Sequence, residues 1–234
     1  MSGLGLWVMG LAGAFLSGSI PFGLLIGLAR GVDVREHGSR NIGATNVTRV
    51  VGRRAGYLCF ALDVLKGALP VVVYGWLAGF AGRGVTSAGE AGMWMCVVCG
   101  AAFGHMFTPW ARFKGGKGVA TGLGAALGVW PALTLPALGA LLIWIVVVRT
   151  TRYVSVASVT AAGLMPLLVL GLGASGATVE AEGVGARLGA VWVYALFAGL
   201  LGGLVIWKHR GNIARLRAGT ERRIGERVEV VEGR

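Results

Sequence analysis

A chain of 234 residues with 55% hydrophobic and only 14% charged residues is unlike a soluble domain, in which about a quarter of residues are charged. The net charge of +12 could suggest nucleic acid, but in a membrane protein basic residues first report loop orientation. Stretches without Asp, Glu, Lys or Arg cover 1–29, 67–82, 91–111, 118–148, 153–179 and 188–207. Since about 20 apolar residues cross a bilayer as a helix, the sequence predicts an all-α integral membrane protein, surrounded by membrane lipid, and no nucleic acid partner.

The first apolar stretch, 1–29, predicts a retained span over about 4–29. It has no basic residue before its apolar core, and it is longer than a signal-peptide core, although "AGA" at 12–14 loosely resembles a cleavage site. We therefore expect this segment to stay in the protein.

The second predicted span, 56–80, carries Asp63 and Lys66. Residues three apart share a helix face, so the two side chains can pair and lower the cost of burying charge in a membrane. Such a pair is a functional candidate by default. We favour a structural role, in which the pair holds this helix beneath the site.

The stretch 118–148 would measure about 46 Å as one helix, more than the roughly 30 Å of a hydrocarbon core. Pro131 and Pro136 favour a break into a hairpin. With the N-terminus outside, the hairpin leaves only Arg83 and Arg187 in outer loops, whereas one long span would move the basic tail outside; the positive-inside rule favours the hairpin. Seven spans with a cytoplasmic C-terminus result, over about 4–29, 56–80, 91–111, 118–130, 132–148, 153–173 and 188–207.

Small polar residues follow the first span, in "HGSRNIGATNVTRVVGRR" at 37–54. Uncharged donors do not serve membrane orientation, and a planar arginine suits bidentate contact with phosphate. Arg53 and Arg54 are better explained as orienting charges. The candidate anion-binding residues are Ser39, Asn41, Gly43, Thr45, Asn46 and Arg49.

A glycine-rich loop, "RFKGGKGVATG" at 112–122, precedes the fourth span. It is not a Walker A loop, because Ala111 replaces the first glycine and Gly118 follows the lysine. Backbone N–H groups of glycines can nevertheless converge on an anion where a helix begins. A flexible turn with two orienting lysines is the alternative. We favour phosphate binding by Lys114, Gly115, Gly116, Lys117 and Gly118.

The last span leaves the membrane in "KHRGNIARLRAGTE" at 208–221, where His209 and Asn212 share a helix face. Histidine can handle protons near neutral pH, so we favour a functional pair over a capping histidine. His37 and His105 are predicted to be positioning residues. The domain is expected to cover 1–220, with a charged, mobile cytoplasmic tail at 221–234 to which we assign no chemistry.

No Ser-His-Asp arrangement, carboxylate dyad or metal-ligand cluster occurs in the sequence, and neither metal nor cofactor is expected. Cys96 and Cys99 form C-x-x-C without a second pair or a nearby histidine, so with Cys59 they are interpreted as unreactive thiols. Catalysis would then depend on binding and orienting anions.

Together these motifs resemble the bacterial acyl-phosphate:glycerol-3-phosphate acyltransferases, the PlsY family, over nearly the whole chain. The resemblance rests on "SGSIPFG", "GSRNIGATNVTR", "DVLKG", "GHMFTPWARFKGGKGVATG" and "HRGNIARLRAGTE". Arg40 departs from it, since the family usually has glycine there; the arginine could crowd the turn or add a phosphate contact. The tail is also longer than usual in the family.

The resemblance implies an enzyme of the bacterial cytoplasmic (inner) membrane, with its active site facing the cytoplasm. It would transfer a fatty acyl group from acyl phosphate to the 1-hydroxyl of sn-glycerol 3-phosphate, the first step of phospholipid synthesis. The products would be lysophosphatidate and inorganic phosphate. The implied catalytic residues are Ser39, Arg49, Lys117, His209 and Asn212, and loop 115–118 would hold a phosphate.

Several alternatives stay open at this point. The base could be His209 or the donor's own phosphate, and Lys117 could bind either phosphate. A carrier for an organic phosphate would also use basic residues, but it needs a polar path to the outer face, where few charged residues lie. A scaffold that binds anionic lipid would need neither "GATN" nor "HRGN". The oligomeric state stays undetermined.

Overall fold

The computed structural model describes residues 3–82 and 87–226, and every regular element within these ranges is helical. The all-α prediction is confirmed for this part of the chain. Arg83 and residues 227–234 of the tail lie outside the described residues. The elements are α1 (Gly3–Ser19), α2 (Phe22–Leu28), α3 (Ala44–Val50), α4 (Arg53–Leu77), α5 (Ala88–Met106), η1 (Pro109–Ala111), α6 (Val119–Leu127), α7 (Thr134–Thr151), α8 (Val154–Ser175), α9 (Val184–Lys208) and α10 (Arg210–Arg217).

Six segments of the described chain are long and apolar enough to cross a bilayer. Large apolar side chains on these helices, such as Leu69, Trp76 and Leu142, are exposed on the outside of the bundle. Exposed apolar surface of this extent suits contact with lipid. The segments are Gly3–Leu28, Arg53–Leu77, Ala88–Ala111, Thr134–Thr151, Val154–Ser175 and Val184–Lys208.

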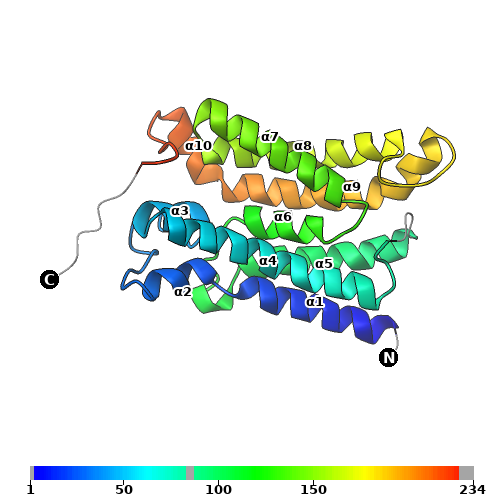
Figure 1. Ribbon diagram of the computed structural model, residues 1–234, viewed down its shortest axis with the longest axis horizontal. Coiled ribbons are helices and arrows are strands. Elements are labelled where there is room, and N and C mark those ends of the chain that lie inside the picture. The colour runs from blue at the N-terminus through cyan, green and yellow to red at the C-terminus, as the bar shows by residue number, and fades with distance from the viewer. Residues whose placement is uncertain (1–2, 83–86, 227–234) are drawn as a thin grey trace.

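The long helices lie side by side and alternate in direction along the bundle (Figure 1). The segment after α2, helix α3, the start of α6 and helix α10 therefore gather at the same end of the molecule, which we call the polar end. All three polar clusters of the sequence lie there. The N-terminus lies at the opposite end (Figure 1).

The predicted break within 118–148 is confirmed. Helix α6 ends at Leu127, α7 begins at Thr134, and the two run in opposite directions (Figure 1). Pro136 lies in the first turn of α7, where its missing N–H costs no intrahelical bond. Because α6 has only 9 residues, it is about 13 Å long, too short to cross a bilayer alone. Where the sequence predicted seven spans, the structure has six candidate spans and this short helix.

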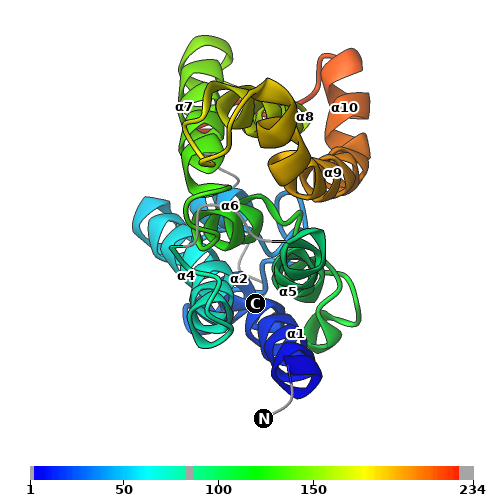
Figure 2. The ribbon, with the colours of Figure 1, turned by 90° about the vertical axis from the view of Figure 1, so that its right-hand side faces the viewer.

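Helix α6 lies in the middle of the molecule, between a group formed by α1, α4 and α5 and a group formed by α7, α8 and α9 (Figure 2). Glycines allow this placement. A Cβ atom at Gly124 would lie 1.9 Å from the carbonyl oxygen of Val64, and one at Gly67 would lie 2.2 Å from that of Thr121. The backbones of α4 and α6 are therefore in direct contact, as small residues permit in membranes.

The predicted Asp63–Lys66 pair forms inside the bundle. The Nζ atom of Lys66 lies 2.7 Å from Oδ1 of Asp63, and both side chains are buried. The same ammonium donates to the carbonyl oxygen of Ile20 at 2.6 Å, and Nδ1 of His105 lies 3.7 Å from Asp63. This cluster joins α4 to the end of α1 and to α5, directly beneath the polar end.

Candidate active site

A cavity of about 240 Å³ lies between the two helix groups and reaches the polar end. Its lining changes along its length. The polar lining residues at the polar end include Ser39, Asn41, Thr45, Arg49, Lys117, His209, Asn212 and Glu221, and Asn46, Asp63, His105, Ser155 and Ser158 also line the cavity. The apolar lining residues include Leu123, Ala126, Leu133, Ala137, Ala140, Leu141, Met165, Ala198 and Leu201. Such a cavity suits a ligand with an anionic head and an apolar chain.

Lys117 lies directly before α6, at the polar end of this cavity. Its Nζ atom donates a hydrogen bond to Oδ1 of Asn212 at 2.5 Å. The following residue, Gly118, has φ of 80°, a left-handed conformation that glycine adopts without steric cost. Burial lowers the pKa of Lys117 to about 8, even though the charge of Glu221 opposes this. Lys117 therefore brings a poorly solvated cation to the cavity.

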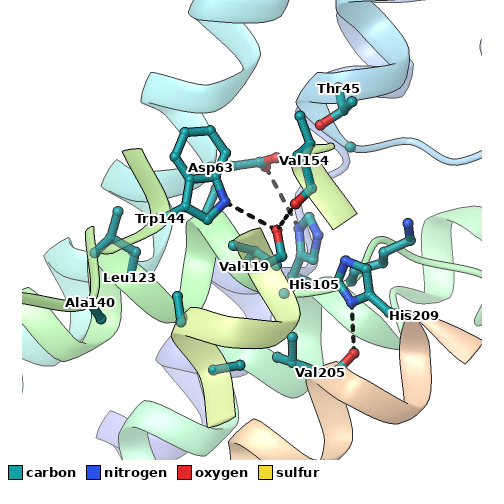
Figure 3. Close-up of a pocket in the computed structure, with 18 of the residues that line it drawn as sticks. Thr45, Asp63, His105, Val119, Leu123, Ala140, Trp144, Val154, Val205 and His209 are labelled. Atoms are coloured by element: carbon teal, nitrogen blue, oxygen red, sulfur yellow. Dashed lines mark hydrogen bonds and ion pairs between the residues drawn. The ribbon is translucent and has the colours of Figure 1, made fainter. Parts of the chain in front are cut away.

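His209 lies between α9 and α10 and faces the cavity (Figure 3). Its Nδ1 atom is 2.8 Å from the carbonyl oxygen of Val205, and a carbonyl only accepts, so Nδ1 carries the proton in the neutral ring. The Nε2 atom is then an acceptor. Burial and the nearby Lys117 charge lower the pKa of His209 to about 4, so the imidazole is neutral at physiological pH.

Asn212 is held by a carboxylate that the sequence analysis did not assign to the site. The amide nitrogen of Asn212 donates to Oε1 of Glu221 at 2.6 Å, and Ser155 and Arg215 also donate to this carboxylate. Burial raises the pKa of Glu221, but these three hydrogen bonds outweigh it and keep the pKa below its usual value. Glu221 thus fixes the amide, with the oxygen turned to Lys117.

The start of the predicted tail is therefore part of the site. Besides Glu221, the backbone oxygen of Arg222 accepts a hydrogen bond from Arg49, and the N–H of Ile224 donates to the oxygen of Arg152. These contacts connect residues far apart in sequence, so no local pattern could have revealed them. The only sequence signal was that the "HRGNIARLRAGTE" motif itself ends on Glu221.

Arg49 reaches the cavity from α3, in the first polar cluster. Burial is the main cause that lowers the pKa of its guanidinium, which nevertheless stays charged at any physiological pH. Ser39, Asn41, Gly43 and Thr45 line the cavity on the same side, and Figure 3 shows Thr45 there. The structure brings these predicted residues together with Lys117, Gly118, His209 and Asn212.

Asn46 lines the cavity, but its hydrogen bonds shape the loop. Its Oδ1 accepts from the N–H of Ser39, and its Nδ2 donates to the carbonyl oxygens of Val34 and His37. The amide is therefore occupied within the protein. The sequence predicts substrate binding for Asn46, whereas its hydrogen bonds indicate that it holds the loop carrying Ser39.

Three other residues predicted to bind substrate do not line the cavity: Lys114, Gly115 and Gly116. Lys114 is exposed. A Cβ atom at Gly115 would lie 2.0 Å from the backbone oxygen of His105, and one at Gly116 would lie 2.0 Å from its Nε2. The two glycines are needed because the loop packs directly against His105, and this packing places Lys117. The predicted positioning role of His105 fits this contact.

Arg40, the departure from the family pattern, has φ of 56°. This left-handed conformation is easy for glycine and costs another residue about 1 kcal/mol. The side chain is exposed and does not line the cavity. Of the two alternatives, the structure supports a mildly strained turn and gives no support to a phosphate contact.

The fold and this cavity define a class: an integral membrane protein with a cavity that is cationic at one end of the helix bundle and largely apolar beyond it. Residues 8–219 match the glycerol-3-phosphate acyltransferase family. The chain belongs to this family, and within it to the PlsY type, as its solved relatives below indicate.

Relatives named glycerol-3-phosphate acyltransferase resemble the chain along nearly its whole length. The protein from Geobacter sulfurreducens is 46% identical over 90% of this chain and 93% of its own, and that from Myxococcus xanthus is 42% identical over 89% and 95%.

Two crystal structures of PlsY, described as an integral membrane glycerol 3-phosphate acyltransferase, have TM-scores of 0.75 and 0.74 and are 35% identical to this chain. The structural matches extend over 94% and 96% of this chain, and over 95% and 96% of the two PlsY chains. One is the lysophosphatidic acid form and the other the glycerol 3-phosphate form.

Proposed function

We propose that this membrane enzyme transfers a fatty acyl group from acyl phosphate to the 1-hydroxyl of sn-glycerol 3-phosphate, as the first step of phospholipid synthesis. The observation that carries the proposal is that one cavity combines a cationic end with a largely apolar interior. Arg49 and Lys117 lie at its polar end, and mostly apolar side chains line the rest of it. Both proposed substrates carry a phosphate, and the donor also carries an apolar chain.

The two cations provide the phosphate sites. Among the residues that the structure describes, neither Arg49 nor Lys117 forms an ion pair with a carboxylate. Two half-buried cations without such partners favour anionic ligands. Ser39, Thr45 and the N-terminal turn of α6 offer further donors beside them.

The proposed reaction balances without a covalent enzyme intermediate. The acceptor oxygen forms an ester bond to the acyl carbon, and the bond from that carbon to the phosphate oxygen breaks. The hydroxyl proton goes to the departing phosphate, and the products are lysophosphatidate and inorganic phosphate. Acyl phosphates are activated donors, so binding and orientation supply most of the catalysis.

We assign His209 the role of orienting the acceptor hydroxyl. Its Nε2 can accept the hydroxyl hydrogen bond, because Nδ1 is bound to Val205. A group with a pKa of about 4 is a weaker base than a phosphate, whose second pKa is about 6. This difference favours the donor's phosphate as the final proton acceptor.

We further propose that the polar end faces the cytoplasm of the bacterial inner membrane, with the N-terminus outside. Most basic residues of the chain belong to segments at this end, as the positive-inside rule requires of cytoplasmic loops. Tagging each terminus and testing protease access in oriented vesicles checks this orientation.

The decisive experiment gives the purified, full-length protein an acyl phosphate and labelled glycerol 3-phosphate. Labelled lysophosphatidate should form together with inorganic phosphate, while acyl-coenzyme A should give none. Absence of product from folded protein would refute the proposed donor. Uptake of glycerol 3-phosphate into vesicles without any donor would instead support a carrier.

A further inference from the structure

A second, lipid-facing cavity lies outside the active site, as a groove between α1, α5 and α9. Its lining side chains are apolar, with small residues such as Ala12, Cys96 and Gly100 among larger ones such as Phe103 and Leu204. No Asp, Glu, Lys, Arg or His is among them. A groove of this kind, within the six candidate spans, is open to the acyl chains of bilayer lipids.

The polar end of this groove carries a cation. Lys208 lies one helical turn beyond Leu204 on α9, so the two share a face. Its Nζ atom lies 4.4 Å from the ring centre of Phe107, and that ring stacks on Phe103 of the groove at 5.9 Å. The carbonyl oxygen of Met106 uses one of its three N–H donors.

A second cation lies on the same face. The guanidinium of Arg210 lies 4.3 Å from the ring of Trp207, and Trp207 continues the stripe that Leu200 and Leu204 begin. In the part of the chain that the structure describes, neither Lys208 nor Arg210 pairs with a carboxylate. An exposed tryptophan between two such cations is typical of the lipid headgroup level.

We propose that this groove is a binding site for one anionic phospholipid of the bilayer. Its acyl chain would lie between α1, α5 and α9, and its phosphate would contact Lys208 and Arg210. Charge complementarity selects the lipid class, because basic pockets between transmembrane helices favour anionic headgroups. A partner helix would fill the apolar groove equally well, but it would give the two cations no counter-charge.

The site is distinct from the active-site cavity, yet the two share a wall. Leu201 lines both cavities, while its neighbours on α9 face one or the other: Leu200 the groove and Gly202 the active site. A lipid in the groove would therefore contact the outer side of the active-site wall. Lys117 and Arg49 belong to the other cavity and should not contribute to lipid binding in the groove.

The test is a titration of the full-length protein in detergent with phosphatidylglycerol or phosphatidylcholine, followed by native mass spectrometry. The wild-type protein should retain one phosphatidylglycerol preferentially. Lys208→Gln/Arg210→Gln should weaken that binding by about tenfold or more, since each basic residue near a membrane surface contributes on the order of 1 kcal/mol. Phosphatidylcholine binding should be unchanged.

Matched variants test whether the groove itself binds the lipid or whether basic residues attract it nonspecifically. Arg53→Gln/Arg54→Gln removes two exposed cations from α4 at the same end and should leave lipid binding within about twofold of wild type. Lys117→Met should also retain the lipid. Cys96→Trp, which fills the groove, should lose both lipids while thermal unfolding confirms an intact fold. Arg210→Gln alone repeats the test at an exposed residue, should the double variant not fold.

Four results would overturn the proposal. Equal loss in the Arg53/Arg54 and Lys208/Arg210 doubles would show nonspecific attraction. Full retention by Cys96→Trp would place the lipid elsewhere, and loss in Lys117→Met would place it in the active site. If the wild-type protein were a dimer and Cys96→Trp dissociated it, the occupant of the groove would be a second copy of the chain.

Discussion

Two clusters of ionisable side chains border the cavity, one at the polar end and one directly beneath it, and they differ in how their charges are compensated. In the buried cluster, Lys66 lies 2.7 Å from Asp63 and bonds Ile20, so its charge is balanced within the protein. In the cavity cluster, Lys117 has an uncharged partner, Asn212, and the nearby carboxylate of Glu221 is bound to Arg215.

We take this difference to separate a structural cluster from the proposed binding site. A charge removed from water needs a partner, and the buried cluster contains its own. The cavity cluster leaves cations at the end of an apolar pocket, where an anionic ligand can supply the missing charge. The same residue type, lysine, therefore has a structural role at position 66 and a proposed substrate-binding role at position 117.

Removing the cavity cation should have the largest effect. Lys117→Met should lower kcat/KM by about a thousandfold, the loss typical of a charge-stabilising donor in an active site, with an unchanged thermal transition. Lys114→Met is the matched control, because Lys114 lies in the same loop but is exposed and outside the cavity; it should keep a rate within about threefold. Similar losses in both variants would contradict the assignment.

Breaking the buried pair should instead affect stability. Lys66→Met leaves the Asp63 carboxylate buried without its partner, which typically costs about 3 kcal/mol, measured by denaturation in micelles. The double variant Asp63→Asn/Lys66→Met should recover most of this loss, because no charge remains. If the single variant were as stable as wild type, the pair would not hold α4 to α1.

Removing the histidine of the cavity cluster should have a smaller effect than removing Lys117. We expect His209→Ala to lower kcat about a hundredfold, with a residual kcat that rises by no more than about twofold between pH 6 and 8, as a phosphate with a second pKa of about 6 completes its ionisation. His37→Ala, in the loop after α2, serves as the control and should stay near wild type. A residual rate that rises steeply with pH would mean that another base on the protein takes the proton.

The pH dependence should show the smallest effect. Because the pKa of Lys117 is lowered to about 8, its positive charge is complete below that pH and is lost above it. Phosphate binding should therefore weaken above about pH 8, by up to about tenfold in kcat/KM per pH unit. The remaining activity of Lys117→Arg should not decline above pH 8, since arginine stays protonated. The same decline in both proteins would exclude Lys117 as its cause.

Local patterns in the sequence predicted much of the site. Charge-free stretches located six candidate spans, and Pro131 and Pro136 predicted the break that makes α6 and α7 separate helices. The spacing of His209 and Asn212, and the uncharged donors around Ser39, predicted residues that do line the cavity. These succeeded because membrane solvation and helix periodicity act over short stretches of chain.

Contacts between distant segments could not be predicted in this way. The roles of Gly115 and Gly116 depend on His105 of α5, and the position of Asn212 depends on Glu221, in a segment taken as a tail. The sequence also did not predict that Asn46 holds its own loop, because all of its hydrogen-bond partners are backbone groups.

By itself, the sequence determined that the protein is helical, that it lies in a membrane, and that its polar residues gather on one side, because hydrophobicity and charge are properties of composition and order. Only the tertiary structure decided which cations remain unpaired. That property depends on which side chains meet across α3, α6 and α10, and glycine-mediated packing of α6 against α4 fixes where α6 lies.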